Sequence, residues 1–279
     1  MSQISEALTN LHQHLKSTSE TPLLDAQVLC AFVLERPRAW ILAHPEAAVT
    51  PPQLKTLHEY LERLLNGEPL PYVLGRCEFY GLDFELTPDT LIPRPETELL
   101  VEHALVWLGD NPGTRLVADV GTGCGCIAVS LAANRDGIRV LGCDISFSAL
   151  EIARINAQNH RLTQEIFFVQ CDLNPPVGVK FDLICANLPY IPSGRLSSLK
   201  AADWEPATSL NGGRDGLDHI RRLLAATQGS LSSSGAVLLE VDISNAAQAA
   251  NLAHQVFPQA NVQVVQDLSG RDRLLSVYL

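Results

Sequence analysis

Apolar side chains recur every three or four positions through the first part of the chain, which is the spacing of one face of an α-helix. They fall into three groups: Ile4, Leu8, Leu11 and Leu15; Leu24, Val28 and Ala31; and Leu54, Leu57, Leu61 and Leu64. Pro22 and Pro52 stand where the second and third groups begin, and Asn66-Gly67 stands where the third ends. The pattern predicts a bundle made of helices only, which we assign to residues 1–72. Such a bundle either serves only as a packing appendage or recognises a substrate, and the pattern leaves both open.

The periodicity then changes from helical to alternating. Cys77–Phe79 and Leu82–Leu86 alternate apolar and polar residues on either side of Tyr80-Gly81, which is suited to a tight turn. This predicts a β-hairpin within residues 73–90 that links the bundle to the rest of the chain.

Strand-like and helix-like segments alternate from residue 115 to the end. The predicted strands are Leu116–Val120, Ile138–Cys143, Ile166–Gln170, Phe181–Ala186, Ala236–Val241, Val262–Val265 and Leu274–Tyr278. Helices are predicted at Cys126–Asn134, Ser148–Asn159, Asp218–Leu231 and Ala246–Val256, with an earlier one opening at Pro95. This alternation predicts an α/β domain with helices on both faces of a sheet, which we assign to residues 91–279. Only a short loop joins the last two strands, so they should pair antiparallel.

Composition narrows the class of protein. A chain of 279 residues with 46% hydrophobic and 18% charged residues is long enough for a large and a small globular domain. No apolar run could span a bilayer and the polar N-terminus lacks a basic signal region, so we expect a cytoplasmic protein that avoids membranes and acts as a monomer. The formal net charge of −11 disfavours direct binding to nucleic-acid phosphates and favours a basic partner surface.

The seven cysteines show no disulfide framework. Cys143, Cys171 and Cys185 lie near the ends of predicted strands, and Cys124 and Cys126 lie in a glycine-rich turn, so parallel strands would gather them at one sheet edge. Because no C-x-x-C pair or histidine partner has the spacing of metal ligands, we predict reduced, packed thiols and no metal site.

A glycine-rich loop ends the first strand of the alternating region. It runs Asp119-Val120-Gly121-Thr122-Gly123-Cys124-Gly125, and Asp144 ends the following strand. Glycines permit positive φ and close approach of a ligand, and an acid at that distance can bind ribose hydroxyls. The spacing differs from the dinucleotide fingerprint, and the absence of a following Gly-Lys-Ser/Thr excludes a P-loop. An ordinary glycine-rich turn is the alternative.

This loop, with its acidic lead-in, resembles the S-adenosylmethionine loop of class I methyltransferases. The resemblance implies that the cofactor is bound by Gly121, Thr122, Gly123, Cys124 and Gly125. It also implies that Asp144 holds the ribose and that Asp172, followed by Leu173, reaches the adenine. All of these residues lie at the carboxyl ends of predicted strands, where open α/β sheets bind ligands.

A second motif, Asn187-Leu188-Pro189-Tyr190, follows the short apolar strand Phe181–Ala186. Asn187 offers one acceptor and one donor, Pro189 lacks a backbone N–H, and Tyr190 supplies a flat face for stacking. This combination suits a substrate amino group on an amide or a nucleobase. Standing alone, the motif would be better explained as a turn after a strand.

When this motif is taken together with other segments of the sequence, the chain resembles the HemK/PrmC family, the bacterial protein-(glutamine-N5) methyltransferases of peptide chain release factors. The segments that carry the resemblance are Leu91-Ile92-Pro93-Arg94-Pro95-Glu96-Thr97-Glu98, the glycine loop, Asn187–Tyr190, Trp204-Glu205-Pro206, Gly212-Gly213-Arg214-Asp215-Gly216-Leu217, Leu239-Glu240 and Asp267-Leu268-Ser269-Gly270-Arg271-Asp272-Arg273. Two positions depart from the family pattern: Leu188 stands where the family has proline, and Asp242 stands where it has glycine.

The resemblance implies a class I, Rossmann-like methyltransferase fold, with a mixed seven-stranded sheet whose last strand is antiparallel. It implies methyl transfer from S-adenosylmethionine, leaving S-adenosylhomocysteine, to the glutamine side-chain nitrogen of the release-factor Gly-Gly-Gln motif. Asn187, Pro189 and Tyr190 would be the catalytic residues. We expect Asn187 Oδ1 and the Leu188 carbonyl to accept the substrate N–H protons while Tyr190 packs on the amide plane.

Two rival hypotheses remain. An adenine N6 methyltransferase of nucleic acids would use the same Asn-Leu-Pro-Tyr chemistry, but the negative charge, the lack of a basic run and the flanking segments disfavour it. An inactive cofactor-binding protein, with Leu188 and Asp242 as signs of decay, is disfavoured because every expected polar site residue is present.

Overall fold

The computed structural model describes residues 2–113, 115–173 and 178–279. Contacts divide the chain into two compact units, Met1–Arg76 and Cys77–Leu279. The finer division into residues 1–72, 73–90 and 91–279 stays a prediction.

The first unit is built from short helices around an apolar core. Its helices are α1 (Ile4–Leu15), α2 (Pro22–Val33), α3 (Arg38–Ala43), α4 (Pro51–Leu65) and α5 (Leu70–Leu74). The expectation of helices only is wrong, because β1 (Ser2–Gln3) pairs antiparallel with β2 (Ala48–Val49). These strands are too short to show a sequence period, and the pairing buries Val49 completely.

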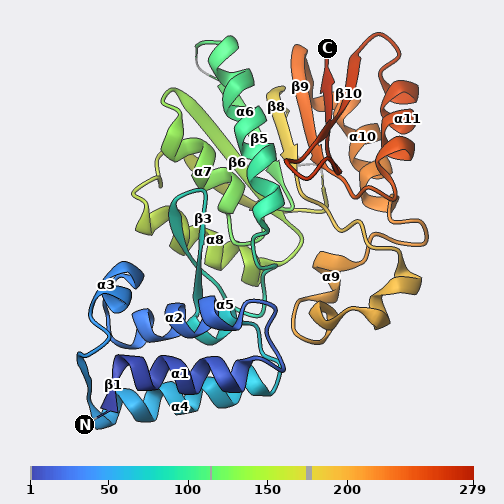
Figure 1. Ribbon diagram of the computed structural model, residues 1–279. Helices are drawn as coiled ribbons and strands as arrows, with labels where there is room; N and C mark the ends of the chain where they lie inside the picture. The colour runs from blue at the N-terminus through green and yellow to red at the C-terminus, as the bar shows by residue number, and fades with distance from the viewer. Residues whose placement is uncertain (1, 114, 174–177) are drawn as a thin grey trace. The chain divides into compact units, whose positions relative to one another are not determined.

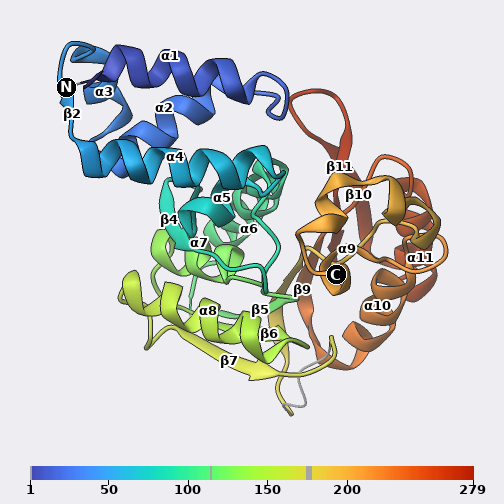
Figure 2. The same ribbon diagram turned by 90° about the horizontal axis from the view of Figure 1, so that it is seen from below.

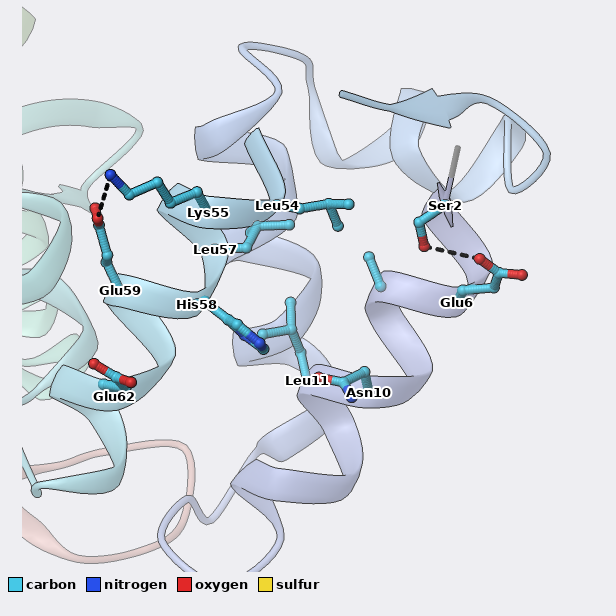
Figure 3. Close-up of a pocket in the computed structure, with 11 residues that line it drawn as sticks. Ser2, Glu6, Asn10, Leu11, Leu54, Lys55, Leu57, His58, Glu59 and Glu62 are labelled. Atoms are coloured by element: carbon cyan, nitrogen blue, oxygen red, sulfur yellow. Dashed lines mark hydrogen bonds and ion pairs between the residues drawn. The ribbon is translucent and has the colours of Figure 1, made fainter. Parts of the chain in front are cut away.

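A cavity of about 640 Å³ opens between α1 and α4 of this unit (Figure 3). Apolar side chains, including those of Leu11 and Leu57, line it. The exposed acids Glu6, Glu59 and Glu62 also line it and outnumber the single lysine there, Lys55, so the cavity combines an apolar floor with a rim of net negative charge.

The second unit contains a seven-stranded sheet (Figure 1). Its strands are β5 (Arg115–Val120), β6 (Ile138–Asp144), β7 (Ile166–Gln170), β8 (Phe181–Ala186), β9 (Leu231–Glu240), β10 (Asn261–Gln266) and β11 (Asp272–Tyr278). They lie in the order β10-β11-β9-β8-β5-β6-β7. Neighbours from β9 to β7 are parallel, whereas β11 is antiparallel to both β9 and β10. The predicted mixed sheet with an antiparallel last strand is confirmed.

Helices cover both faces of this sheet (Figure 2). One side carries α6 (Glu98–Asp110), α7 (Cys126–Asn134) and α8 (Phe147–Asn159), and the other carries α10 (Asp218–Ser230) and α11 (Ala246–Val256). The described part of the unit also contains the short 3-10 segments η1 (Pro95–Thr97), η2 (Ser193–Ser198) and η3 (Lys200–Asp203) and the one-turn helix α9 (Ala207–Leu210). The helix expected to open at Pro95 therefore begins as a 3-10 turn.

The predicted hairpin is formed by β3 (Arg76–Phe79) and β4 (Leu82–Glu85). Tyr80 and Gly81 both have positive φ, 52° and 72°, as a two-residue hairpin turn requires. The buried side chain of Asn156, on α8, accepts from Glu85 N at 2.7 Å and donates to Glu85 O at 3.0 Å. It also donates to Cys124 O at 2.8 Å, so one amide ties the hairpin to the glycine loop.

Replacing Asn156 by alanine should destabilise the protein by about 2 kcal/mol, because the backbone N–H and C=O of Glu85 and the buried C=O of Cys124 all lose their side-chain partner. Urea unfolding measures the change in the free energy of unfolding. Asn159→Ala is the matched control: the exposed Asn159 side chain on the same helix donates to Glu85 Oε1, its one partner among the described residues, and its loss should cost less than about 0.5 kcal/mol. Equal losses in the two variants would contradict the structural role of Asn156.

Candidate active site

The strand register brings the predicted site residues to one edge of the sheet. Val120 of β5 lies opposite Cys143 of β6 on one side and Ala186 of β8 on the other. Ala186 in turn lies opposite Leu239 of β9. The segments that follow these residues therefore emerge side by side at the carboxyl ends of the parallel strands (Figure 1).

The glycine loop folds back over the neighbouring strand. The backbone N–H groups of Gly121 and Thr122 both donate to Cys143 O, at 2.8 and 2.9 Å. Gly123 N donates to Asp144 Oδ2 at 2.9 Å. Gly121, Gly123 and Gly125 all have positive φ, and a Cβ on Gly121 would lie 3.0 Å from Leu188 Cδ2. The loop therefore packs directly against the second predicted motif.

Asp119, in the first predicted strand, carries a buried oxygen without a donor. Its Oδ2 accepts from Thr122 Oγ1 at 2.6 Å and from Ala128 N at 3.1 Å. Its Oδ1 is buried and has no hydrogen-bond partner among the described residues. Burial raises the pKa of Asp119 to about 7; the two hydrogen bonds oppose the shift, and nearby Asp144 adds to it. A buried unpaired carboxylate oxygen fits a ligand that brings a cationic amino group.

This raised pKa predicts a pH-dependent stability. Between about pH 4 and pH 7 the folded protein binds a proton at Asp119 that the unfolded chain releases, so stability falls as pH rises through this window. Asp119 alone contributes at most ~1.4 kcal/mol per pH unit to this slope, and the raised pKa of Glu240 adds a decline of the same sign. We expect Asp119→Asn to show a shallower decline than the wild type in urea unfolding across this range. Exposed Asp89→Asn should keep the wild-type slope, and equal slopes in all three proteins would refute the assignment.

The two other predicted cofactor acids have different surroundings. Asp144 is half-buried, and its Oδ1 accepts from Ser146 N at 2.9 Å, which together with the Gly123 contact fixes the carboxylate. Asp172 is exposed and forms an ion pair with Arg222 Nη2 at 2.6 Å. Leu173 adopts positive φ, 64°, and its carbonyl accepts from Cys143 Sγ at 3.5 Å.

In the Asn-Leu-Pro-Tyr motif, each polar side chain is held by a specific partner. Asn187 Nδ2 donates to Thr97 Oγ1 at 3.0 Å, and none of the described residues donates to its Oδ1. Leu188 is buried beneath the glycine loop. The Tyr190 hydroxyl donates to Glu240 Oε1 at 3.3 Å, and burial together with that carboxylate raises the pKa of Tyr190.

Glu240 is a site residue to which we assigned no role from the sequence. It ends β9, it is 3% exposed, and its Oε2 accepts from Thr97 Oγ1 at 2.6 Å. Burial raises the pKa of Glu240 to about 7; the hydrogen bonds from Thr97 and Tyr190 oppose the shift, Glu96 adds to it, and Arg273 opposes it. Two sequence signals pointed to this position: an acid at the end of a strongly apolar run, and the place of Leu239-Glu240 among the segments that carry the family resemblance.

A small cavity of about 140 Å³ adjoins the motif. Its lining residues are Leu91, Arg94, Asn187, Leu188, Tyr190, Ile191, Leu199, Ala201, Ser209 and Leu210. Arg94 Nη2 donates to the buried Glu205 Oε1 at 2.5 Å, which links two segments far apart in sequence at the cavity wall. Its mainly apolar lining and few polar groups are typical of a site for one small side chain.

All seven cysteines are free thiols, as predicted. Burial raises the pKa of the Cys143 and Cys185 thiols, so these remain protonated near neutral pH. Within the described parts of the chain, no three His, Cys, Asp or Glu side chains gather as metal ligands would. Nor does any helix there combine the length and apolar character that crossing a membrane requires.

Two protein-family models match the chain. Residues 6–75 match the PrmC N-terminal domain, and residues 95–202 match the methyltransferase small domain. Among solved structures, a methyltransferase from Pyrococcus furiosus has a TM-score of 0.52 at 17% identity, covering 72% of this chain and 90% of its own. RsmC, a 16S rRNA methyltransferase from T. thermophilus in complex with AdoMet and guanosine, has a TM-score of 0.54 at 16% identity, covering 73% of this chain and 49% of its own. These likenesses show the methyltransferase fold.

Curated relatives match over nearly the whole length. The release factor glutamine methyltransferase of Coxiella burnetii is 37% identical over 277 residues, covering 99% of this chain and 98% of the relative. That of Moorella thermoacetica is 39% identical, covering 93% of this chain and 92% of the relative. At this identity and coverage, the chain belongs to the release factor glutamine methyltransferase family.

Proposed function

We propose that this protein transfers a methyl group from S-adenosylmethionine to the side-chain amide nitrogen of the glutamine in the release-factor Gly-Gly-Gln motif. The observation that carries the proposal is the placement of Asn187. Its donor nitrogen is engaged by Thr97 and its oxygen has no donor among the described residues, beside a cavity sized for a small side chain. The named relatives support the choice of substrate.

The substrate nitrogen is a weak nucleophile because its lone pair is conjugated with the amide carbonyl. Asn187 Oδ1 and the Leu188 carbonyl accept hydrogen bonds from its two N–H groups and orient the lone pair, while Tyr190 packs against the amide plane. Positioning and placement of acceptors supply the rate gain, without a covalent enzyme intermediate. On transfer the nitrogen would gain a bond to the methyl carbon as the carbon–sulfur bond of the cofactor breaks, and one N–H proton would leave to water.

The residues of the sheet edge fit the proposed cofactor. The backbone of Gly121–Gly125 would hold it, with Asp144 at the ribose, and Asn187 would stand between cofactor and substrate. Asp172 and Leu173 would reach the adenine, for which Asp172 must share or leave Arg222. The unpaired Oδ1 of Asp119 suits a cationic amino group. When bound, S-adenosylmethionine supplies an electrophilic methyl group on a positively charged sulfur.

The direct test is an assay with radiolabelled S-adenosylmethionine and three separate acceptors: a release factor, its Gly-Gly-Ala variant and rRNA. We expect label on the wild-type release factor alone. Label on the Gly-Gly-Ala variant would move the target residue elsewhere. Label on rRNA would favour the adenine methyltransferase alternative, to which the Asn-Leu-Pro-Tyr motif is equally suited.

The helical unit is proposed to recognise the protein substrate. Its cavity between α1 and α4 has an apolar floor, and within the described chain Glu62 at its rim has no ion-pair partner (Figure 3). Lys55 is already paired with Glu59, at 3.7 Å. This surface is complementary to a basic amphipathic segment of the release factor.

Glu62→Lys should therefore raise the KM for an intact release factor about fivefold, the equivalent of losing about 1 kcal/mol. The kcat and the KM for a short Gly-Gly-Gln peptide should not change, because the peptide lacks the basic segment. Glu20→Lys makes the same charge change at another exposed position of this unit and serves as control. An equal rise in KM for both variants would mean that overall charge, and not this cavity, governs binding.

We also propose that the protein acts as a cytoplasmic monomer. Its free thiols are suited to a reducing compartment. Sedimentation equilibrium at micromolar concentration would test the monomer, and a mass of twice 30.3 kDa would overturn it.

A further inference from the structure

Glu240 connects both polar ends of the Asn-Leu-Pro-Tyr motif. One of its carboxylate oxygens accepts from the Thr97 hydroxyl at 2.6 Å and the other from the Tyr190 hydroxyl at 3.3 Å. Thr97 in turn accepts from Asn187 Nδ2 at 3.0 Å. Thr97 is 1% exposed and Glu240 is 3% exposed, so these groups satisfy one another without bulk water.

The direction of each hydrogen in this chain follows from simple counting. An ionised carboxylate can only accept, so the single hydroxyl hydrogen of Thr97 must point toward Glu240. The Thr97 oxygen is then left as an acceptor, and the group of Asn187 that faces it must be the N–H2. The Asn187 carbonyl oxygen consequently faces the opposite way. Reversing the Asn187 amide would place its oxygen against the Thr97 oxygen, acceptor against acceptor.

We propose that Glu240 is a positioning residue, which acts through the Thr97 hydroxyl to hold the Asn187 amide with its oxygen toward the substrate nitrogen. This inference rests on the proposed function, because an oxygen is the required group only when the substrate presents N–H2. An Asn187 amide in the reversed orientation would place its own N–H2 group against the N–H2 group of the substrate, and two donors repel each other. Glu240 also fixes the Tyr190 ring, so one carboxylate orients both contacts to the substrate.

The proposal implies that protonation of Glu240 loosens the arrangement. A protonated carboxyl at 2.6 Å can donate to the Thr97 oxygen, which frees the Thr97 hydrogen to point at Asn187 and favours the reversed amide. The charged or titratable groups around Glu240 are Glu96, Tyr190 and Arg273, of which Glu96 raises its pKa and Arg273 lowers it. Burial dominates and holds the pKa of Glu240 near 7, within the range of an enzyme assay.

Thr97→Val tests the connection, because valine has the shape of threonine and lacks the hydroxyl. We expect its kcat for release-factor methylation to be at least tenfold lower than wild type, with S-adenosylhomocysteine binding, measured by calorimetry, within about twofold. Thr97→Ser is the matched control: it keeps the hydroxyl and should retain kcat within about threefold. Thermal unfolding identifies any variant that fails to fold. Glu240→Gln is tested in the same way, by comparing its kcat and its S-adenosylhomocysteine binding with those of the wild type.

The dependence of kcat on pH separates positioning from a merely structural role. The wild type and Thr97→Ser should lose activity as pH falls from 8 to 6, whereas Thr97→Val should be low and nearly flat, since its Asn187 no longer senses Glu240. A Thr97→Val enzyme with wild-type kcat, or with the wild-type pH profile at reduced kcat, would overturn the proposal. Wild-type protein that labels no release factor would instead overturn the proposed function itself.

Discussion

Replacing Asn187 by alanine is expected to lower the kcat for glutamine methylation about 100-fold or more, the usual cost of removing one preorganised hydrogen-bonding group at a reacting atom. The side chain ends at a small cavity with its oxygen available, and its nitrogen is held by Thr97 at 3.0 Å. Alanine leaves the substrate N–H2 with only the Leu188 carbonyl as acceptor. Single-turnover assays with saturating S-adenosylmethionine would measure the loss directly.

The control for Asn187 must separate chemistry from folding and from cofactor binding. Asn159→Ala removes an exposed asparagine on α8 and should keep wild-type turnover. S-adenosylhomocysteine binding to Asn187→Ala should weaken less than about tenfold, since the glycine loop and Asp144 are unchanged. Full turnover in Asn187→Ala, with cofactor binding intact, would remove this residue from the mechanism.

Strongly periodic segments were predicted to the residue. The helices Cys126–Asn134 and Ala246–Val256 and the strands Ile166–Gln170 and Phe181–Ala186 have the predicted bounds. Their limits coincide with changes of hydrophobic pattern, which sequence shows directly. The strand expected at Ala236–Val241 instead spans Leu231–Glu240, because the serines that follow Leu231 carry no apolar signal.

In the candidate site, too, the sequence predicts the features that are local in the chain and misses those that depend on long-range contacts. The glycine loop and Asn187–Tyr190 are continuous in sequence, so their chemistry could be inferred from the residue types. The partnership of Thr97 and Glu240 joins residues 143 positions apart and depends on where two unconnected segments meet. Asn156 is similar, because its bonds to Glu85 depend on a contact 71 positions away.

The departure at Leu188 has a structural explanation that leaves the chemistry intact. The leucine side chain is 4% exposed and packs beneath the glycine loop, where a Cβ on Gly121 would lie only 3.0 Å from Leu188 Cδ2. Its backbone carbonyl, the group proposed to accept a substrate proton, does not depend on side-chain type. Asp242, the second departure, accepts hydrogen bonds from Ser244 N and Ser244 Oγ, and its Oδ2 lies 3.8 Å from Arg273 Nη1. It therefore belongs to a paired polar cluster after β9.

Replacing Gly216 by alanine is expected to distort the Asn187–Tyr190 motif. Gly216 is buried at φ +79°, and a Cβ there would lie 2.3 Å from Tyr190 O. Alanine at this φ costs about 1–2 kcal/mol, and overpacking adds a similar amount, so Gly216→Ala should lose about 3 kcal/mol of stability. Because relief of the clash requires the Tyr190 backbone to move, kcat should also fall at least about tenfold.

Gly229→Ala is the matched control for this effect. Gly229 is exposed in the last turn of α10, and a Cβ there meets nothing within 4 Å. Since alanine favours the helix by up to ~1 kcal/mol, this variant should be as stable as the wild type or more so, with unchanged kcat. Urea unfolding and turnover are measured on both variants at a temperature where each is folded. A Gly216→Ala enzyme that is destabilised but keeps full kcat would contradict this prediction. It would mean that the Tyr190 backbone can move to accommodate the methyl group without a loss of catalysis.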